Sequence, residues 1–305
     1  MQSPLTPNNH NCWTILDVLK WTASYFKRHG IENGRIDAEV LLANVLESRR
    51  IDLYLHYDQP LTVDELHRFR GLIKRRANRE PIAYIIGEQE FWSLCFIVSK
   101  DILIPRPETE CIVETALNIV RGSDKPDPFK ILELGTGSGA IMIALASEMP
   151  NNCFVATDLS LNAIKIARKN ERQLIADNII SWIVGDWLKP VKETDVNYDL
   201  IVSNPPYIRK DMIQKLQPEI FLFEPISALD GGIDGLSCYK KIIPEAANRL
   251  CPGGYLLLEI GFDQKESIDK IARNCVCFES ISFKKDYSGH DRVAILRLSR
   301  SRVDR

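Results

Sequence analysis

The sequence predicts an α/β protein in which a small N-terminal helical domain precedes a seven-stranded mixed sheet. Three observations lead to this prediction. Apolar residues recur at helical spacing from about residue 13 to residue 78. Apolar strands then alternate with helical stretches from residue 130 onward, which is typical of a mostly parallel sheet covered by helices on both faces. Only residues 284–291 separate the last two strands, too few for a helical crossover, so these strands must pair antiparallel.

The length, charge and hydropathy of the chain argue against chain-wide attraction to nucleic acid, membrane insertion and secretion. The chain has 305 residues, of which 45% are hydrophobic, so it is long enough to bury a large core. Its 39 Lys and Arg and 41 Asp and Glu residues give a net charge of −2, which offers no chain-wide attraction to nucleic acid. No apolar run reaches the roughly 18 residues that span a bilayer, and the N-terminus lacks the pattern of a signal peptide. We therefore expect a cytoplasmic protein without membrane association.

The helical domain is expected over residues 1–80. Thr62 and Glu65 have the spacing of a capping box, which predicts that the last helix of this domain starts there. That helix carries basic residues opposite its apolar stripe: Arg68, Arg70, Lys74, Arg75, Arg76 and Arg79. Two interpretations stay open, of which we favour the first: a solvated helix face, or a patch that steers an acidic partner or ribosomal RNA.

A hairpin and a helix are expected over residues 81–121 as a connection to the second domain. The runs EFW and LCFIV meet at a turn formed by Trp92 and Ser93, and a helix follows from about Pro107 to Arg121. Between them, Arg106 either borders a cleft or ties the connection down. The second domain then covers residues 122–305, with strands expected at 130–134, 153–157, 179–184, 198–203, 254–260, 277–283 and 292–298.

A glycine-rich segment follows the first of these strands directly. It reads Glu133-Leu-Gly135-Thr136-Gly137-Ser138-Gly139 and leads into a helix at Ala140. Glycines let the backbone turn sharply and approach a ligand at the positive end of a helix. The spacing G-x-G-x-G differs from the dinucleotide fingerprint G-x-G-x-x-G. We therefore predict S-adenosylmethionine as the cofactor, with Glu133 near its ammonium group.

Polar and aromatic residues end the next two strands. Asp158 follows the second strand, where a carboxylate can accept both hydroxyls of an unphosphorylated ribose. Asp186 and Trp187 follow the third strand and suit the exocyclic amine and the ring face of adenine. Because the carboxyl ends of parallel strands meet at one edge of a sheet, these residues are expected to share a cleft with the glycine segment.

The fourth strand ends at Asn204-Pro205-Pro206-Tyr207. Each proline fixes its own φ and keeps the residue before it extended, so the loop is rigid. The side-chain oxygen of Asn204 and the carbonyl of Pro205 can then accept the two N–H bonds of a planar NH2 group. Tyr207 can stack on that group and exclude water. The sequence therefore predicts methyl transfer to a planar nitrogen.

No metal ion is expected. The five histidines show no ligand spacing with Cys, Asp or Glu, and the eight cysteines include no C-x-x-C pair. We interpret the cysteines as reduced core residues, with Cys275 and Cys277 on one face of a strand.

The segments ELGTGSG and NPPY together resemble class I S-adenosylmethionine-dependent methyltransferases that act on exocyclic or amide nitrogens. Flanking segments narrow this resemblance: REPIAY at 79–84, IPRPETE at 104–110, FEP at 223–225, ALDGG at 228–232 and DRV at 291–293. They look like the PrmC (HemK) family of protein-(glutamine-N5) methyltransferases, which modify the GGQ glutamine of class I peptide chain release factors. The resemblance runs from about residue 13 to residue 298.

The resemblance implies a Rossmann-like fold, cofactor contacts at Gly135–Gly139, Asp158, Trp187 and Asn204, and a glutamine pocket at Asn204–Tyr207. It implies that the helical domain helps to dock a release factor, and we expect a monomer that needs no direct contact with nucleic acid. Ser288 and His290 depart from the Gly and Gln that relatives commonly show.

Two alternative functions stay open at this point. A nucleic-acid amino methyltransferase acting on adenine or guanine would share NPPY, because an exocyclic amine has the same planar geometry. It would also need to flip a base into the site and hold the backbone in a basic channel. A catalytically inactive cofactor-binding protein that binds release factors is the second alternative.

Overall fold

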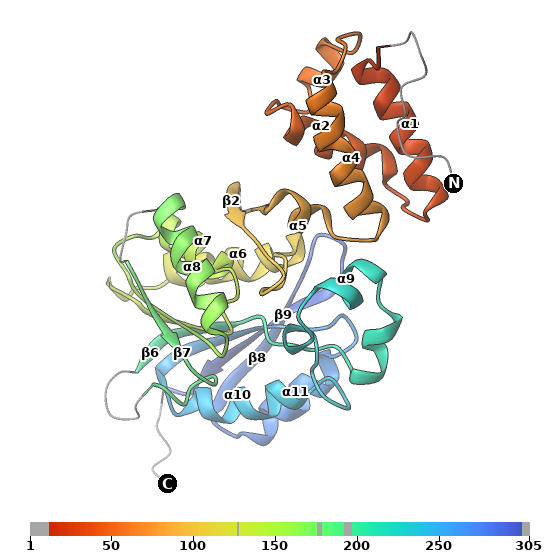
Figure 1. Cartoon of the computed structure of the whole chain (residues 1–305). Coiled ribbons are helices and arrows are strands. Elements are labelled where there is room, and N and C mark those ends of the chain that lie inside the picture. Colours follow the sequence, from red (N-terminus) through yellow and green to blue (C-terminus); the bar gives the residue numbers. More distant parts are fainter. Residues whose placement is uncertain (1–11, 127, 176–178, 192–196, 301–305) are drawn as a thin grey trace. The chain divides into compact units, whose positions relative to one another are not determined.

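The computed structural model describes residues 12–126, 128–175, 179–191 and 197–300, and the chain divides into two compact units (Figure 1). Unit 1 comprises the chain up to Gly87 together with the short segment Gln217–Phe223. Unit 2 comprises Glu88–Leu216 and the chain from Glu224 onward. None of the helices in the described ranges is long and apolar enough to cross a membrane.

Unit 1 is built from helices around one apolar core. They are α1 (Ile15–Arg28), α2 (Gly34–Val45), α3 (Asp52–Leu55), α4 (Val63–Ala77), α5 (Ile82–Ile86) and α9 (Pro218–Phe223). The predicted capping box is confirmed: the Glu65 N–H donates to Thr62 Oγ1 at 3.3 Å, and Thr62 N donates to the Glu65 carboxylate at 2.7 Å. Phe26 of α1 and Phe69 of α4 are fully buried in the core.

The basic residues of α4 are not all solvated. Arg76 is buried, and its Nε and Nη2 atoms donate to Asp37 at 2.7 Å and to Glu219 at 2.8 Å. Arg79 donates to the other oxygen of Glu219, also at 2.8 Å. The favoured interpretation of a solvated face is therefore wrong for Arg76 and Arg79, whose charges are neutralised inside unit 1, whereas Arg68 is exposed.

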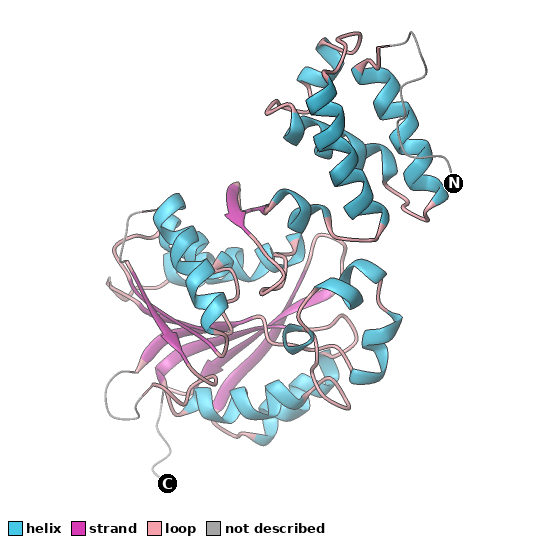
Figure 2. Cartoon of the chain, viewed as in Figure 1, coloured by secondary structure: helices cyan, strands magenta, loops and turns pink. Residues whose placement is uncertain are grey.

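Unit 2 contains the predicted seven-stranded mixed sheet (Figure 2). Its strands are β3 (Lys130–Leu134), β4 (Cys153–Asp158), β5 (Ile180–Val184), β6 (Tyr198–Ser203), β7 (Leu250–Glu259), β8 (Phe278–Lys285) and β9 (Asp291–Leu298). They lie in the order β5-β4-β3-β6-β7-β9-β8. Only β9 is reversed, since it pairs antiparallel with both β7 and β8, whereas the other neighbours are parallel. The predicted antiparallel final pair is confirmed.

Helices cover both faces of this sheet (Figure 1). On one face lie α6 (Glu110–Arg121), α7 (Ala140–Glu148) and α8 (Leu161–Leu174), and on the other lie α10 (Ser237–Ala247) and α11 (Lys265–Asn274). Side chains alternate between the two faces along each strand, so Ile131 belongs to the core under α6 and α7 while its neighbour Leu132 belongs to the core under α10. The 3-10 helices of the described residues are η1 (Pro107–Thr109), η2 (Lys210–Lys215) and η3 (Ile226–Ala228).

Residues 81–121, which we expected to connect the domains, are divided between the two units. Helix α5 belongs to unit 1, whereas the predicted hairpin of β1 (Glu88–Phe91) and β2 (Leu94–Ile97) belongs to unit 2, as does α6. Trp92 and Ser93 form the hairpin turn with φ of 53° and 58°, the left-handed values that a two-residue turn matching the strand twist requires.

The placement of several cysteines differs from the prediction. Cys12, Cys95 and Cys153 are exposed and therefore not core residues. Cys275 ends α11 and Cys277 lies before β8, so the two do not share a strand.

Candidate active site

A cavity of about 260 Å³ lies at the carboxyl ends of the central parallel strands of unit 2. Most of the predicted site residues line it together: Glu133, Gly135, Thr136, Gly137, Ser138, Asp158, Asp186, Trp187, Asn204 and Pro206. Gly139, Pro205 and Tyr207 are not among the lining residues. The structure thus brings the glycine segment, three strand ends and the Asn-Pro-Pro loop to one site.

The glycine segment turns sharply between β3 and α7. Gly135, Gly137 and Gly139 have φ of 73°, 56° and 81°, which residues with a Cβ atom rarely adopt. A Cβ atom added to Gly135 would lie only 3.2 Å from Cζ3 of Trp187. The loop is also tied to β4, because the N–H groups of residues 135 and 136 both donate to the Thr157 carbonyl. Glycine at position 135 therefore lets the loop that leads into α7 pack closely against the ring of Trp187.

Glu133 is an almost fully buried acid beside the cavity. It is 1% exposed and accepts a hydrogen bond from the Thr136 hydroxyl. Burial, together with the negative charge of Asp158 and against the opposing Thr136 bond, raises its pKa to about 8. A cation in the cavity would compensate the buried charge, which suits the predicted role beside an ammonium group.

Asp158 ends β4 with both carboxylate oxygens on backbone donors. One oxygen accepts from the N–H of Gly137 and the other from the N–H of Ser160, each at 2.8 Å. Burial raises the pKa of Asp158, and these two backbone bonds oppose the shift. Each oxygen keeps a free lone pair, so the carboxylate can still accept two ribose hydroxyls, and its orientation is already fixed.

Trp187 and Asp186 follow β5 at the other side of the cavity. Trp187 has φ of 50°, and its carbonyl accepts from the Thr157 hydroxyl at 3.1 Å, which holds the ring near Gly135. Asp186 forms an exposed ion pair with Lys189 at 2.5 Å. The remaining lone pairs of this carboxylate can still accept from an adenine amine.

The Asn204–Tyr207 loop is held by contacts from distant segments. Asn204 Nδ2 donates to Thr109 Oγ1 at 3.2 Å, and the Tyr207 hydroxyl donates to Glu259 Oε1 at 3.3 Å. A Cβ atom on Gly231 would approach the Cα of Tyr207 to 2.8 Å, so glycine is needed where the ALDGG segment packs on this loop. Besides its own prolines, the loop therefore depends on three other segments, those of Thr109, Gly231 and Glu259.

Neither Thr109 nor Glu259 was among the site residues predicted from the sequence. Glu259 is the last residue of β7, the strand next to β6, and is 1% exposed. Burial raises its pKa to about 7, opposed by the Thr109 bond and by the charge of Arg292. An acid at the carboxyl end of a neighbouring parallel strand was a usable signal, the same one that pointed to Asp158.

Buried polar contacts hold the segments around the cavity in place. Glu224 is buried, and it pairs with Arg106 and accepts from the Ile104 N–H at 3.4 Å. Arg106 lines the cavity, so it both borders the cleft and ties down its own segment. Asn170 of α8 donates to the carbonyls of Ser138 and Ile97 at 2.9 and 3.1 Å, which links the glycine segment to β2.

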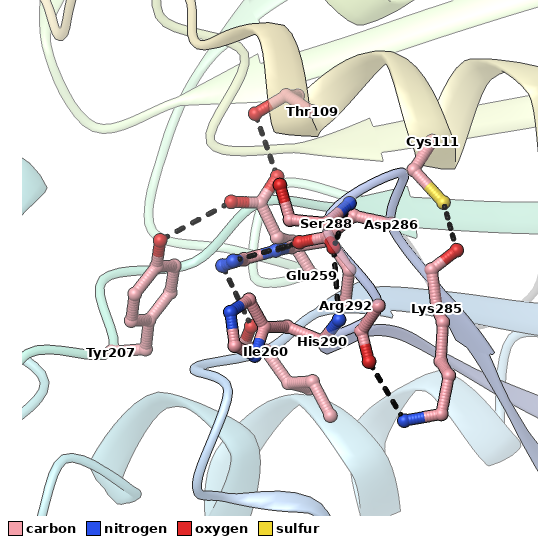
Figure 3. A network of polar contacts seen from close by, with 11 residues as sticks. Thr109, Cys111, Tyr207, Glu259, Ile260, Lys285, Asp286, Ser288, His290 and Arg292 are labelled. Atoms are coloured by element: carbon pink, nitrogen blue, oxygen red, sulfur yellow. Dashed lines mark hydrogen bonds and ion pairs between the residues drawn. The ribbon is translucent and has the colours of Figure 1, made fainter.

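Figure 3 shows the polar contacts that surround Glu259 and Arg292. Arg292 donates to Asp286 at 3.1 Å, and Asp286 in turn accepts from the backbone N–H groups of Ser288 and His290 at 3.0 Å. These contacts need no particular side chain at Ser288 or His290, so the departures from the family pattern leave this network intact. Within the ranges that the structure describes, no three His, Cys, Asp or Glu side chains gather as a metal site would require.

Comparison with known proteins agrees with the geometry of both units. The model of the PrmC N-terminal domain matches residues 17–87, and that of the methyltransferase small domain matches residues 119–222. The release factor glutamine methyltransferase of Geobacter sulfurreducens is 42% identical over 92% of this chain and 95% of that protein. The enzyme of the same name from Coxiella burnetii is 42% identical over 86% and 91%.

A solved structure supports the fold. The hMettl16 catalytic domain, solved in complex with a 3′UTR hairpin, matches with a TM-score of 0.56 at 16% identity, over 77% of this chain and 84% of that one. The fold is that of class I S-adenosylmethionine-dependent methyltransferases, as predicted. With relatives 42% identical over nearly their whole length, the resemblance that the motifs indicated is confirmed. The chain belongs to the family of release factor glutamine methyltransferases.

Proposed function

We propose that this enzyme transfers a methyl group from S-adenosylmethionine to the side-chain amide nitrogen of the GGQ glutamine of class I peptide chain release factors. The observation that carries the proposal is the amide of Asn204, which lines the cavity while its Nδ2 atom is already bound to Thr109. Its oxygen is thus left to accept an N–H bond from a planar amide. The names of the relatives supply the substrate class.

The residues of the cavity fit the proposed cofactor. Glu133 would face its ammonium group, the Gly135–Gly139 loop would approach it closely, Asp158 would accept its ribose hydroxyls, and Trp187 would cover its adenine. When bound, S-adenosylmethionine supplies an electrophilic methyl group on a sulfonium centre and leaves as S-adenosylhomocysteine. The strongest part of this fit is Asp158, whose orientation is fixed by two backbone bonds.

The chain's own residues then act by positioning and electrostatics. Asn204 Oδ1 and the Pro205 carbonyl accept the two N–H bonds of the glutamine amide, which aligns the nitrogen and raises its electron density. The nitrogen forms its bond to the methyl carbon as the carbon–sulfur bond breaks. The amide proton leaves afterwards, because alkylation makes it more acidic, so no general base is required.

Unit 1 is proposed to dock the release factor, since it carries no cofactor residues and matches the PrmC N-terminal domain. It presents exposed apolar side chains at Ile51, Tyr54, Leu55 and Tyr57, which suit recognition of a folded protein. The proposal also has the enzyme act as a monomer in the cytoplasm, where release factors work, without metal or direct nucleic-acid binding.

The test is a methylation assay with tritiated S-adenosylmethionine. Purified release factor, its GGQ-to-GGA variant, plasmid DNA and ribosomal RNA are offered separately. We expect label on the release factor alone, and about a hundredfold slower turnover for Asn204→Ala, the loss typical of one oriented polar group. Asn248→Ala, an exposed change on unit 2, is the matched control. Equal labelling of the GGA variant, or labelling of nucleic acid instead, would refute the proposal.

A further inference from the structure

Thr109 and Glu259 form a buried chain of hydrogen bonds behind Asn204. Asn204 Nδ2 donates to Thr109 Oγ1 at 3.2 Å, and Thr109 Oγ1 donates to Glu259 Oε2 at 2.7 Å. Figure 3 shows Thr109 and the ring of Tyr207 on two sides of Glu259, each with a dashed line to its carboxylate. Thr109 is 5% exposed and Glu259 is 1% exposed, so water does not replace these contacts.

The donors and acceptors in these hydrogen bonds decide which way the Asn204 amide points. A threonine hydroxyl has a single hydrogen, and a carboxylate can only accept. Because Thr109 gives its hydrogen to Glu259, only a lone pair of Oγ1 faces Asn204, and only the NH2 end of the amide can bind there. The rotated amide would set oxygen against oxygen, at a cost of about 1 to 3 kcal/mol for the buried groups left without a partner.

The backbone alone does not select between the two orientations of the Asn204 side-chain amide. The two prolines hold Asn204 extended, but the two ends of its amide have nearly the same size and shape, and rotation about the last side-chain bond exchanges them. An inverted amide would present N–H donors toward the cavity, where the substrate amide also presents N–H donors.

We propose that Thr109 and Glu259 are positioning residues for methyl transfer, which fix the Asn204 amide so that its oxygen accepts from the substrate nitrogen. This inference rests on the proposed function for the identity of that nitrogen. Neither residue needs to touch the substrate. Thr109 acts through Asn204, and Glu259 acts through Thr109 while it also accepts from Tyr207.

The charges around Glu259 are compatible with an ionised carboxylate, which this hydrogen-bond arrangement requires because Glu259 accepts from Thr109. Arg292 of β9 offsets its negative charge, whereas Glu108 of η1 and burial oppose ionisation. Arg292 keeps its own partner Asp286, so removing the Glu259 charge does not leave the guanidinium unpaired. Because the pKa of Glu259 is about 7, the kinetic tests below belong at about pH 8.5, where the carboxylate is ionised.

The test compares Thr109→Val, which keeps the shape and loses the hydroxyl, with Thr109→Ser, which keeps the hydroxyl. We expect kcat on intact release factor at saturating cofactor to fall about tenfold or more for Thr109→Val, and to stay within about threefold of wild type for Thr109→Ser. Affinity for S-adenosylhomocysteine should differ little between the two variants. Thr109→Val should melt at a lower temperature than wild type, because it leaves Glu259 and the Asn204 NH2 group without a buried partner.

A double-mutant cycle separates positioning from a general structural effect. If Thr109 acts only through Asn204, Thr109→Val should cost nothing further in kcat once Asn204→Ala is present. Glu259→Leu should lower kcat about as much as Thr109→Val, and the double variant should lose no more than the larger single loss. Should Glu259→Leu fail to fold, the Thr109 and Asn204 cycle still decides the question.

Three results would overturn the inference: wild-type kcat in Thr109→Val, equal losses in the Val and Ser variants, or multiplication of the Thr109 and Asn204 losses. Each variant is compared with wild type on whichever substrate the wild type methylates. A wild type that ignores release factor but methylates nucleic acid would therefore refute the proposed function, while the ratios among variants would still test the positioning of Asn204.

Discussion

Cofactor binding should release a proton from Glu133. In the free protein this carboxyl is buried beside the cavity, and burial raises its pKa to about 8. The ammonium group of S-adenosylmethionine or S-adenosylhomocysteine, placed next to Glu133, favours the ionised form and lowers that pKa. Binding and ionisation are therefore linked, and the cofactor should bind more tightly as the pH rises toward 8.

The size of the effect follows from the pKa of the free protein. With a pKa of about 8, Glu133 is roughly 90% protonated at pH 7, so a bound state that holds it ionised releases about 0.9 proton per site. Between pH 6 and pH 7.5 the dissociation constant should fall roughly twentyfold. Both pH values keep the ammonium group protonated, so this change is attributable to the protein.

Isothermal titration calorimetry with S-adenosylhomocysteine measures the released proton. Titrations at one pH in two buffers of different ionisation enthalpy give the number of protons released, and Glu133→Gln provides the control of equal volume that cannot ionise. The variant should release no proton at this site and bind with little dependence on pH. Wild type that releases no proton, or a Gln variant that releases as many as wild type, would show that Glu133 does not face the ammonium group.

The raised pKa also predicts how stability depends on pH in the free protein. The unfolded chain ionises Glu133 near its ordinary pKa of 4.5 and the folded chain only near 8. The stability that this difference contributes is present below about pH 4.5 and is lost as the pH rises to about 8. The melting temperature of wild type should therefore fall relative to that of Glu133→Gln over this interval, and parallel melting curves would contradict the assignment.

Three further changes test other parts of the structure. Asp158→Ala should weaken S-adenosylhomocysteine binding by about 1.5 to 3 kcal/mol, roughly 10- to 150-fold, through loss of the ribose bonds, and unchanged affinity in calorimetry would refute that contact. Arg76→Met should lower the free energy of unfolding by about 3 kcal/mol, because the buried Asp37 and the partly buried Glu219 each lose a partner; exposed Arg68→Met should change it by less than about 0.5 kcal/mol in the same denaturant titrations. Leu55→Asp should raise KM for intact release factor about tenfold without changing KM for a GGQ peptide, unlike the exposed Tyr287→Asp on unit 2, and equal kinetics for both variants would argue against docking by unit 1.

The sheet was predictable because local pattern and chain geometry both constrain it. Six parallel strands and one reversed strand followed from the spacing of apolar runs and one short connection. The start of β7 was missed by four residues, since the prediction began at 254 and the strand begins at Leu250. Its early part contains Pro252 and Gly253, which read as a turn, and the pairing with β6 shifts register between Tyr198 and Leu200. An irregular strand start of this kind has no periodic signal.

The site was predictable wherever a residue follows a parallel strand. Glu133 lies near the end of β3, Asp158 ends β4, and Trp187 and Asn204 follow β5 and β6. The structure gathers all four around one cavity. Partners brought together only by the fold were not predictable. The sequence of α4 indicates solvated arginines, because nothing near Arg76 reveals that its partner Glu219 lies 143 residues away.

The Asn-Pro-Pro-Tyr motif has one property that its own sequence predicts and one that depends on residues brought to it by the fold. Proline acts within the loop, so the sequence alone indicates a rigid backbone there. The direction of a terminal amide is a different property, since its two ends fit the same space and differ only in the hydrogen bonds they form. Here the orientation of the Asn204 amide depends on the Thr109 hydroxyl, 95 residues from Asn204 in the sequence, and on the Glu259 carboxylate, which lies 150 residues after Thr109. A loop grafted onto another scaffold would therefore lose the selection of amide orientation unless residues equivalent to Thr109 and Glu259 came with it.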